Sequence, residues 1–470
     1  MKLSHFILLL VSVATLHFFL AMRIAPADDE LYYWCWSKEL QPSYFDHPPV
    51  TAYLIRASTF VFGDTLFAIR FPACLCALGS IVLIGHLTGR RGIGWLLATP
   101  MIALGSILMT PDAPVLFFWT AYAVWLIKIQ QAGTRPHWSM WLLGGVLLGL
   151  GGLSKYTMAL AVPGALLSFL LNRDPLKAPW RLGFISHLLI CLAVLSPVFI
   201  YNAMNDFSPL RFQFNHAAGK SSAFSPLKLA EFVGTQVLLF GALPFVLLPW
   251  CLANRRELGA DNRLRVSMWM FLFPTIFFLL KGATGRVEGN WPFISYMTVL
   301  PLALRQWDGL REASWARRWL MPASFGIPAI ATIVIVAQSI VHVPLPGRAD
   351  RLAVMNSRLD ATRQVVEWAK AEGISHIYGP NYQITSQLKF QQIDAAQMPG
   401  LSRESHFTMG KSKVVDPSIY VYLYLDKPGL FPQMNHQLGY GYPQRLLTIP
   451  ETIGDKSVGE YALFRYDRLD

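Results

Sequence analysis

The chain has 470 residues, of which 53% are hydrophobic and only 14% are charged. A soluble globular domain carries about 25% charged residues, so this chain has too few charges to cover a water-exposed surface. Its 34 Gly and 31 Pro residues follow no period, which excludes a collagen-like chain. A membrane protein remains. The net charge of +12 then reflects Arg and Lys on the cytoplasmic side, and no nucleic-acid partner is indicated.

Long apolar runs predict about eleven membrane-spanning helices, because a helix needs roughly 17–25 apolar residues to cross a bilayer. The first run has an alternative interpretation as a cleaved signal peptide, with Lys2 at its start and Ala25-Pro26-Ala27 near its end. The runs lie at residues 6–22, 66–88, 92–109, 114–128, 138–153, 157–171, 183–201, 229–252, 266–280, 291–304 and 320–341.

The distribution of charge between the runs predicts which side of the membrane each loop faces. With a cytoplasmic N-terminus, the inside loops are short and basic, as the positive-inside rule requires. These loops carry Arg90, Arg91, Arg135, Arg173, Lys177, Arg181, Arg255, Arg256, Arg263, Arg265, Arg305, Arg311, Arg317 and Arg318. Most acidic residues then fall outside, and two of the outside loops, 23–65 and 205–228, are large.

The composition changes near residue 345, where apolar runs shorten and charges become frequent. Residues 359–371 have the spacing of an amphipathic helix, and 374–378, 418–425 and 459–466 read as strands. We therefore expect a polytopic α-helical membrane domain over residues 1–344 and a small soluble α/β domain over 345–470. An odd number of spans places this second domain in the periplasm.

Acidic residues are concentrated in the first outer loop, directly after the first apolar run. Asp28, Asp29 and Glu30 are followed by Tyr32, Tyr33 and Trp34. An acidic triplet at this place is also typical of a helix N-terminus, whose dipole favours negative charge, and the aromatic residues fit an interfacial belt. A further acid, Asp112, lies between two prolines at a membrane boundary, where it could simply cap the next helix.

Basic residues also interrupt the apolar runs on the outer side. Lys155 lies between two short runs, and Lys281 and Arg286 precede the run that starts at residue 291. Each could extend harmlessly to the lipid headgroups. An ionisable residue at a membrane segment is nonetheless a candidate functional group, and acids and bases together on one face of an apolar bundle favour that interpretation.

The chain resembles the GT-C superfamily of membrane glycosyltransferases at several motifs. They are Asp29-Glu30 with Tyr32-Tyr33-Trp34, Tyr44-Phe45-Asp46-His47-Pro48-Pro49, Thr110-Pro111-Asp112-Ala113-Pro114, Gly152-Leu153-Ser154-Lys155 and Arg286-Val287-Glu288-Gly289-Asn290-Trp291-Pro292. The resemblance covers about residues 25–300 and is strongest to the branch that contains lipid A aminoarabinose transferases and lipopolysaccharide galacturonosyl transferases. Protein O-mannosyltransferases are more distant relatives.

The resemblance implies an inverting glycosyltransferase that takes a sugar from a polyprenyl-phosphate carrier at the periplasmic face of the inner membrane. The implied acceptor is lipid A or the lipopolysaccharide core. Asp29 matches the superfamily's catalytic aspartate, although the preceding Asp28 leaves the assignment one residue uncertain, and Asp112 matches a second acid. Fixed cations stabilise the phosphate leaving group most in the transition state.

The candidate site residues follow from these motifs and from the charges near them. The catalytic candidates are Asp29, Asp112 and Glu30. The candidates for binding the donor phosphate are Lys155, Arg286, Lys281 and His47. The candidates for binding the substrate are Asp28, Tyr33, Asp46, His216, Glu288 and Asn290.

One departure concerns the first outer loop, where the aminoarabinose branch has Glu-Lys before the two prolines and this chain has Asp46-His47. A divalent metal held by Asp46, His47 and His216 is an alternative to phosphate or sugar contact by the histidines. No ligand spacing supports a metal site, and the five cysteines contain no Cys-x-x-Cys pair.

Other function classes remain open on the sequence alone. A flippase or another transporter of lipid-linked sugars is one alternative, although transporters often show inverted repeats and charges near the membrane midplane. A protein O-glycosyltransferase is another. A non-catalytic scaffold would leave the acids and bases on one side without a purpose.

Overall fold

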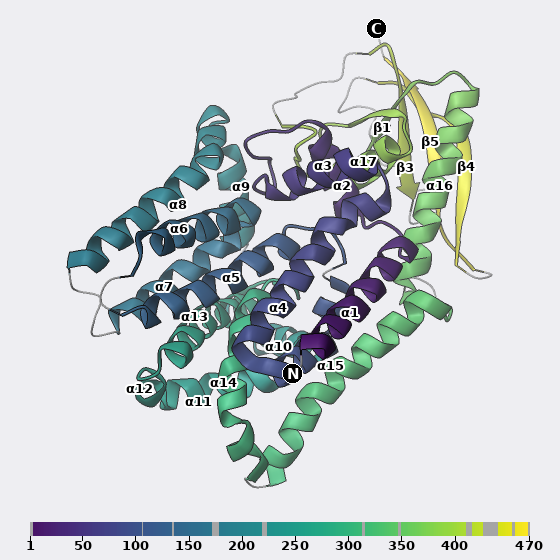
Figure 1. The fold of residues 1–470 in the computed structure, drawn as a ribbon. Coiled ribbons are helices and arrows are strands. Elements are labelled where there is room, and N and C mark those ends of the chain that lie inside the picture. The colour runs from purple at the N-terminus through teal and green to yellow at the C-terminus, as the bar shows by residue number, and fades with distance from the viewer. Residues whose placement is uncertain are drawn as a thin grey trace. The chain divides into compact units, whose positions relative to one another are not determined.

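A computed structural model gives the structure of the chain (Figure 1). It describes residues 3–105, 107–133, 136–171, 178–218, 223–312, 315–345, 349–409, 416–425, 440–453 and 456–468. The chain divides into two compact units. The helical unit comprises Met1–Ala21 and His47–Ala337, and the mixed unit comprises Met22–Asp46 and Gln338–Asp470. The segment 22–46 thus belongs with the C-terminal part of the chain, from which it is separated by about the length of the membrane domain.

The helical unit follows the apolar runs of the sequence. Its helices are α1 (Leu3–Arg23), α3 (Val50–Phe62), α4 (Leu66–Ala98), α5 (Asp112–Gln131), α6 (Trp138–Ser154), α7 (Ala161–Leu170), α8 (Ala178–Met204), α9 (Ser208–Ala218), α10 (Pro226–Phe240), α11 (Leu243–Ala253), α12 (Arg255–Leu258), α13 (Asn262–Thr284), α14 (Phe293–Glu312) and α15 (Trp315–Val341). A π-helical turn at Met101–Gly105 and a 3-10 helix at Tyr156–Leu160 lie between them.

The helices confirm a multi-pass membrane protein but not the expected count of eleven spans. Within the described ranges, six helices are long and apolar enough to cross a bilayer, and a seventh span results if α10 and α11 count as one. Three of the predicted runs form shorter helices of 10–17 residues, namely Trp138–Ser154, Tyr156–Leu170 and Phe293–Arg305, and Val50–Phe62 is a further short apolar helix within the expected outer loop. The expected count of eleven, which includes these shorter helices, stays a prediction.

Two glycines with left-handed backbone angles interrupt the helices, one between the predicted runs 66–88 and 92–109 and one inside the predicted run 229–252. Gly89 has φ 65° and divides α4 at a kink. Gly241 has φ 82° and separates α10 from α11, which meet at 106°. The single span expected over 229–252 is thus a bent pair. Glycine tolerates these left-handed backbone angles because it has no Cβ atom.

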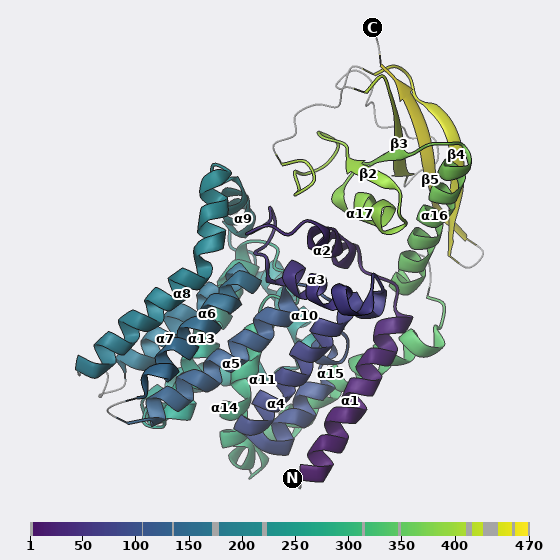
Figure 2. The ribbon, with the colours of Figure 1, turned by 45° about the horizontal axis from the view of Figure 1, so that its top comes forward.

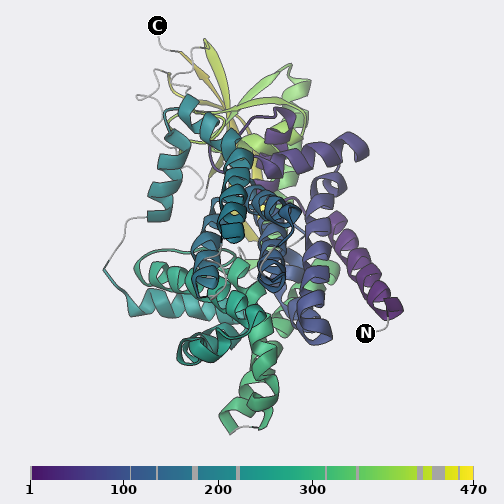
Figure 3. The ribbon, with the colours of Figure 1, turned by 60° about the vertical axis from the view of Figure 1, so that its left-hand side comes forward.

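Helix α5 is the most enclosed of the six long apolar helices, with 78% of its apolar window buried, whereas α1 and α8 have 22% each. It is in contact with α4, α6, α13 and α14, and the arrangement of these helices can be followed in Figure 3. Trp119, Tyr122 and Trp125 on α5 are part of the hydrophobic core. The first residue of this buried helix is Asp112, so one candidate site residue is fixed by the core itself.

The mixed unit contains a five-stranded sheet with the strand order β2-β1-β3-β5-β4. Strands β2, β1 and β3 are parallel, whereas β5 is antiparallel to both β3 and β4 (Figure 2). The elements are α2 (Asp28–Lys38), α16 (Arg351–Ala371), β1 (His376–Gly379), α17 (Tyr382–Phe390), β2 (Asp394–Gln397), β3 (Ser418–Leu425), β4 (Gln444–Ile453) and β5 (Lys456–Asp467). The amphipathic helix and the three strands expected from the sequence are all present.

Helices α16 and α17 cover one face of the sheet. Val365 and Leu388 from these helices share a core with Ile377, Tyr422 and Leu463 from the strands. Their neighbours in β3 and β5 point to the opposite face, as the alternation of a strand requires. Helix α2 packs against α17, so the acidic first loop is anchored on a folded α/β core.

The two segments expected to be large outer loops contain helices. Residues 23–65 include α2 and all of α3, and residues 205–228 include α9 and the start of α10. The assignment of 1–344 and 345–470 as separate domains stays a prediction, since the compact mixed unit includes residues from both.

Candidate active site

Three residues that the sequence placed in different roles form one cluster in the helical unit. Lys155 Nζ donates a hydrogen bond of 2.7 Å to Asp112 Oδ1, and Asn290 Nδ2 donates one of 2.9 Å to Asp112 Oδ2. The Lys155 side chain is only 8% exposed and that of Asp112 is 21% exposed. Both carboxylate oxygens are therefore held by donors, and the ammonium group lies in a largely dehydrated place.

Local structure explains why Lys155 points to this cluster. Helix α6 ends at Ser154, and Lys155 itself is extended, with φ −156° and ψ 139°. A 3-10 helix begins at the next residue, and the Met158 N–H donates to the Lys155 carbonyl at 3.0 Å. The helix interruption that the sequence pattern predicted thus turns the lysine toward the N-terminus of α5, where Asp112 lies.

Lys281, Arg286 and Glu288 lie at the end of α13 and in the segment that joins it to α14. Arg286 Nε is 3.1 Å from Glu288 Oε1, and both side chains are well exposed. Lys281 is half-buried in the last turn of α13. Arg286 and Glu288 therefore neutralise each other. Asn290, two residues later, is the member of this segment that contacts Asp112.

An apolar cavity of about 230 Å³ adjoins the residues that flank Lys155. Gly152 and Tyr156, on either side of the lysine, are among its lining residues. The rest of the lining is Leu148, Met158, Ala159, Val162, Cys191, Leu195, Val198, Phe199 and Leu210. A hydrocarbon chain fits such a surface, since the hydrophobic effect favours removing both from water.

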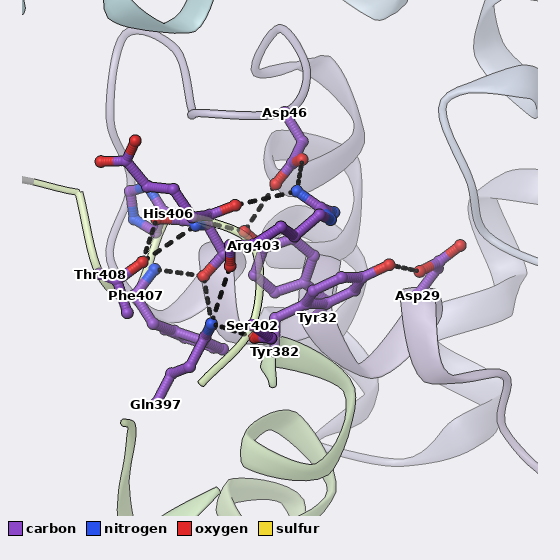
Figure 4. A network of polar contacts seen from close by, with 12 residues as sticks. Asp29, Tyr32, Asp46, Tyr382, Gln397, Ser402, Arg403, His406, Phe407 and Thr408 are labelled. Atoms are coloured by element: carbon purple, nitrogen blue, oxygen red, sulfur yellow. Dashed lines mark hydrogen bonds and ion pairs between the residues drawn. The ribbon is translucent and has the colours of Figure 1, made fainter. Parts of the chain in front are cut away.

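In the mixed unit, each aspartate of the first loop accepts hydrogen bonds from the C-terminal part of the chain. Arg358 and Gln387 donate to Asp28. The Tyr382 hydroxyl donates to Asp29 Oδ1 at 3.0 Å. Arg403 Nη1 donates to Asp46 Oδ1 at 2.7 Å. The three acids thus share one network with the C-terminal residues, and Figure 4 shows its part around Asp29 and Asp46.

Asp46 is fixed on both oxygens. The Tyr32 hydroxyl donates to Oδ2 at 2.7 Å, opposite the contact with Arg403. The Tyr32 oxygen in turn accepts a hydrogen bond of 2.7 Å from the His406 backbone N–H. Asp46 is 6% exposed whereas the Arg403 side chain is 41% exposed, so a buried carboxylate with both oxygens hydrogen-bonded is paired with an arginine that solvent still reaches.

Asp29 differs from its neighbours because its side chain is exposed. The protein atoms crowded around its carboxyl group raise the pKa of Asp29 by desolvation, and the charges of Asp28 and Asp46 raise it further. The hydrogen bond from Tyr382 and the charge of Arg403 lower the pKa and oppose these effects. Water still reaches the carboxylate, which limits the size of the shift. An accessible carboxylate with a raised pKa has the properties of a general base.

Glu30 has a structural role. It is fully buried, and its Oε2 accepts a hydrogen bond of 2.9 Å from the Ala27 N–H at the start of α2. This is the capping interaction expected of an acid in the first turn of a helix. The catalytic role expected for Glu30 stays a prediction, and this capping contact and the burial of the carboxylate do not favour it.

The other predicted site residues occupy varied places. Tyr33 is 6% exposed and packs edge-on against Trp36. His47 precedes α3 in the helical unit, whereas Asp46 belongs to the mixed unit. His216 lies on α9, and its side chain is outside the described part of the structure. The roles of Tyr33, His47 and His216 in substrate binding stay predictions.

A metal role for Asp46 does not fit its surroundings. Both of its carboxylate oxygens are engaged with Tyr32 and Arg403, and a cation next to an arginine would be repelled. Among the described residues, no group of three or more His, Cys, Asp or Glu side chains is arranged to hold a metal ion. The contacts of Asp46 do not favour the metal alternative, and a divalent metal held by Asp46, His47 and His216 stays a prediction.

Sequence reasoning missed the residues that hold the acidic loop, namely Arg358, Tyr382, Gln387 and Arg403. They lie more than three hundred positions from their partners along the chain, for example 353 between Tyr382 and Asp29. No spacing rule covers such a distance. The nearest available signal was a basic residue, Arg403, in an otherwise irregular polar segment.

Comparison with known proteins relates this architecture to glycosyltransferases. Residues 46–201 match the family described as dolichyl-phosphate-mannose-protein mannosyltransferase. The lipid A galacturonosyltransferase RgtD of Rhizobium johnstonii is 24% identical over 384 residues, which cover 78% of each chain. An undecaprenyl phosphate-alpha-4-amino-4-deoxy-L-arabinose arabinosyl transferase of Erwinia tasmaniensis is 26% identical over 331 residues, 65% of this chain and 58% of that protein.

The fold has a counterpart among solved structures. ArnT from Cupriavidus metallidurans, bound to undecaprenyl phosphate, superposes with a TM-score of 0.65 and 13% sequence identity. The match covers 99% of this chain and 98% of that chain, so it includes the helical and the C-terminal parts. The resemblance predicted from the motifs is confirmed: the chain has the fold of a GT-C membrane glycosyltransferase.

Proposed function

We propose that the chain is an inverting glycosyltransferase that moves a sugar from a polyprenyl-phosphate carrier to lipid A or the lipopolysaccharide core. Two kinds of relative support this function. One is named a lipid A galacturonosyltransferase, and the other is named for an undecaprenyl-phosphate-linked aminoarabinose. The identity of the sugar is left open, because both a uronic acid and an amino sugar occur among these names.

The observation that carries the proposal is the cluster of Lys155, Asp112 and Asn290 beside an apolar cavity. A polyprenyl phosphate combines a long hydrocarbon with an anionic head. The cavity suits the first part of the hydrocarbon, and the Lys155 ammonium group suits the phosphate. The hydrogen bond to Asp112 keeps the lysine oriented in a poorly hydrated place until the donor binds.

The reaction is a displacement at the anomeric carbon of the sugar. A nucleophilic oxygen of the acceptor attacks this carbon, and the bond from the carbon to the phosphate oxygen breaks. The bonding electrons leave with the polyprenyl phosphate, where negative charge increases. Lys155 stabilises that charge more in the transition state than in the bound donor, which lowers the barrier.

Asp29 acts on the acceptor substrate, and its role depends on the chemical group that attacks the sugar. For a hydroxyl acceptor, the carboxylate takes the hydroxyl proton while the new glycosidic bond forms. For a phosphate acceptor, which is already anionic, the carboxylate accepts hydrogen bonds from the sugar and orients it. A single displacement inverts the anomeric configuration in either case.

The location follows from the charge distribution. The basic loops favour a cytoplasmic N-terminus, with the acidic first loop and the C-terminal part in the periplasm. The enzyme then acts at the periplasmic face of the inner membrane. Its donor arrives as a lipid from within the bilayer, so it requires no soluble nucleotide sugar.

Transfer from a synthetic polyprenyl-phosphate sugar to a lipid A acceptor by the purified full chain tests the proposal. We expect wild-type transfer with inversion, and a loss of about a hundredfold or more in Lys155→Ala. Lys128→Ala is the matched control, because Lys128 is an exposed lysine in the last turn of α5. Movement of the lipid-linked sugar across a bilayer without cleavage of its glycosidic bond would instead identify a flippase.

A further inference from the structure

We propose that Tyr382 and Arg403, both from the C-terminal part of the chain, are positioning residues for the Asp29 carboxylate. The inference rests on the proposed function, in which Asp29 serves the acceptor. It gives the C-terminal part a role in the reaction that neither the motifs nor the names of the relatives assign. The argument starts from the contacts around Asp29, which Figure 4 displays.

Tyr382 holds one oxygen of Asp29. Its hydroxyl donates to Oδ1 at 3.0 Å, and Figure 4 shows the other oxygen directed away from Tyr382 on a side chain that is exposed. Tyr382 is the first residue of α17, whose N-terminus is fixed because the Asn381 side chain accepts a hydrogen bond from the Ile384 N–H. The Tyr382 ring also packs 4.5 Å from the Tyr32 ring of α2. The hydroxyl is therefore a rigid donor, and Asp29 has one oxygen left for the acceptor.

Arg403 fixes Tyr382 from the opposite side. Its guanidinium lies 4.5 Å from the centre of the Tyr382 ring. The same group donates to Asp46 Oδ1 at 2.7 Å and to the Glu404 carbonyl at 3.0 Å. Since Asp46 is buried and also bonded to Tyr32, the arginine cannot move without leaving a buried charge unpaired. Tyrosine and arginine thus form one rigid support behind Asp29.

The charges around Asp29 make this support chemically important. Asp28 and Asp46 are both near enough to raise the pKa of Asp29. Asp28 is compensated by Arg358 from α16, and Asp46 by Arg403. The other polar groups of the network are Tyr32, Tyr382, Gln387 and the His406 N–H. Loss of the arginine would expose Asp29 to the full charge of Asp46, and loss of the tyrosine hydroxyl would remove the neutral donor that holds Asp29 Oδ1.

Substitution of Tyr382 or Arg403 should therefore change the pH dependence of kcat. Asp29 must be ionised to accept a proton or a hydrogen bond. The contacts from Tyr382 and Arg403 lower its pKa, so their removal raises it. The acidic limb of the kcat profile then moves to higher pH, and activity recovers as the pH increases. A role in folding alone would lower the yield of active enzyme without moving this limb.

Tyr382→Phe and Arg403→Gln in the full chain test the inference through kcat and KM measured across pH. We expect kcat near neutral pH to fall on the order of tenfold, as for groups that orient a reactive side chain, with KM for the lipid donor unchanged. The acidic limb should lie at higher pH in both variants. Arg403→Lys retains the charge, so its limb should lie closer to that of wild type.

Matched controls are available in the same unit. Tyr378→Phe removes a tyrosine hydroxyl that donates to Asp416 at 2.7 Å, and Arg445→Gln removes an arginine 3.1 Å from Glu460 that also lies over the Phe464 ring. Neither change should move the acidic limb. An unshifted limb in Tyr382→Phe, a substitution that preserves the ring and its packing, would overturn the inference.

Asp29→Asn separates this inference from the proposed function. If Asp29→Asn retains full transfer, Asp29 has no chemical role and the proposed site is wrong. If Asp29→Asn is inactive while Tyr382→Phe and Arg403→Gln have the wild-type pH profile, the site stands and only the positioning role fails. An inactive Asp29→Asn with shifted limbs in the two variants supports both.

Discussion

Lys155 donates a 2.7 Å hydrogen bond to Asp112, and the pair joins the end of α6 to the start of α5. A lysine that is already paired can still bind a phosphate, because its ammonium group has three donor hydrogens. The carboxylate then acts as a fixed counterion. The free-energy cost of removing water from the lysine is met when the protein folds, so donor binding does not have to meet it. This arrangement prepares the site for an anionic lipid before the lipid arrives.

The Lys155–Asp112 pair should show strong energetic coupling. Lys155→Met and Asp112→Asn alone each break a largely buried pair, and we expect each to cost about 3 kcal/mol of unfolding free energy. The double variant should cost less than the sum, because no unpaired charge remains. Thermal unfolding in detergent, in a double-mutant cycle, measures the coupling. Additive effects would show that the two charges are independently solvated.

Position 290 should tolerate a smaller side chain better than a negatively charged one. Asn290→Ala removes the 2.9 Å hydrogen bond to Asp112 and should cost about 1 kcal/mol of stability. Asn290→Asp keeps the shape but places a second carboxylate against Asp112, so it should be the more damaging change for both stability and transfer. A comparison of the two variants by unfolding temperature and initial rate checks this order. Equal effects would contradict the direct contact.

Filling the apolar cavity should weaken binding of long-chain donors. Ala159 lines the cavity and is exposed, so Ala159→Trp can occupy this space without disturbing the core. We expect KM for a polyprenyl donor to rise about tenfold, equivalent to roughly 1.4 kcal/mol. A short-chain donor should be little affected. Leu143→Trp, an exposed position of α6 outside the cavity lining, is the control.

Gly241 should tolerate no side chain. A Cβ atom there would lie 2.1 Å from the Ser324 carbonyl oxygen, and φ of 82° disfavours other residues. Gly241→Ala should therefore lower stability by more than about 2 kcal/mol. Gly234→Ala in α10 is the matched control, because a Cβ atom there meets nothing within 4 Å and alanine favours a helix. Unfolding temperatures of the two variants should move in opposite directions.

Because of Asp350, the unfolding free energy of the mixed unit should decrease as the pH falls in the acidic range. Burial of its carboxyl group would raise its pKa, but hydrogen bonds from the Ala353 and Leu345 N–H groups and from His342 lower the pKa overall. A depressed folded-state pKa contributes stability above the unfolded value of about 3.9, and this contribution is lost as pH falls through the lower folded value.

Asp350→Ala tests that contribution and the cap of α16 together. We expect a loss of about 1 kcal/mol at neutral pH, since the substitution removes an N-cap. The difference from wild type should shrink on acidification below the unfolded pKa. Unfolding curves recorded along a pH series provide the measurement. A difference that stays constant into strong acid would show that the charge of Asp350 is not involved.

Several features of the site were predictable from local sequence. The break between two apolar runs at Lys155 and the two prolines around Asp112 indicate a membrane boundary, and both residues lie at helix ends. The acids at 28–30 indicated a helix N-terminus as well as a possible site, and the structure separates these roles. Glu30 caps α2, whereas Asp29 is exposed.

By itself the sequence determined a multi-pass membrane protein, a C-terminal α/β segment and the GT-C resemblance, because hydropathy, strand alternation and short motifs act over neighbouring residues. Only the tertiary structure decided that residues 22–46 fold with the C-terminal part, that Gly241 bends a run into two helices, and that Tyr382 and Arg403 hold the acidic loop. The physical reason is that these contacts join residues far apart in the chain. Packing and the pairing of buried charge select them, and neither leaves a local pattern.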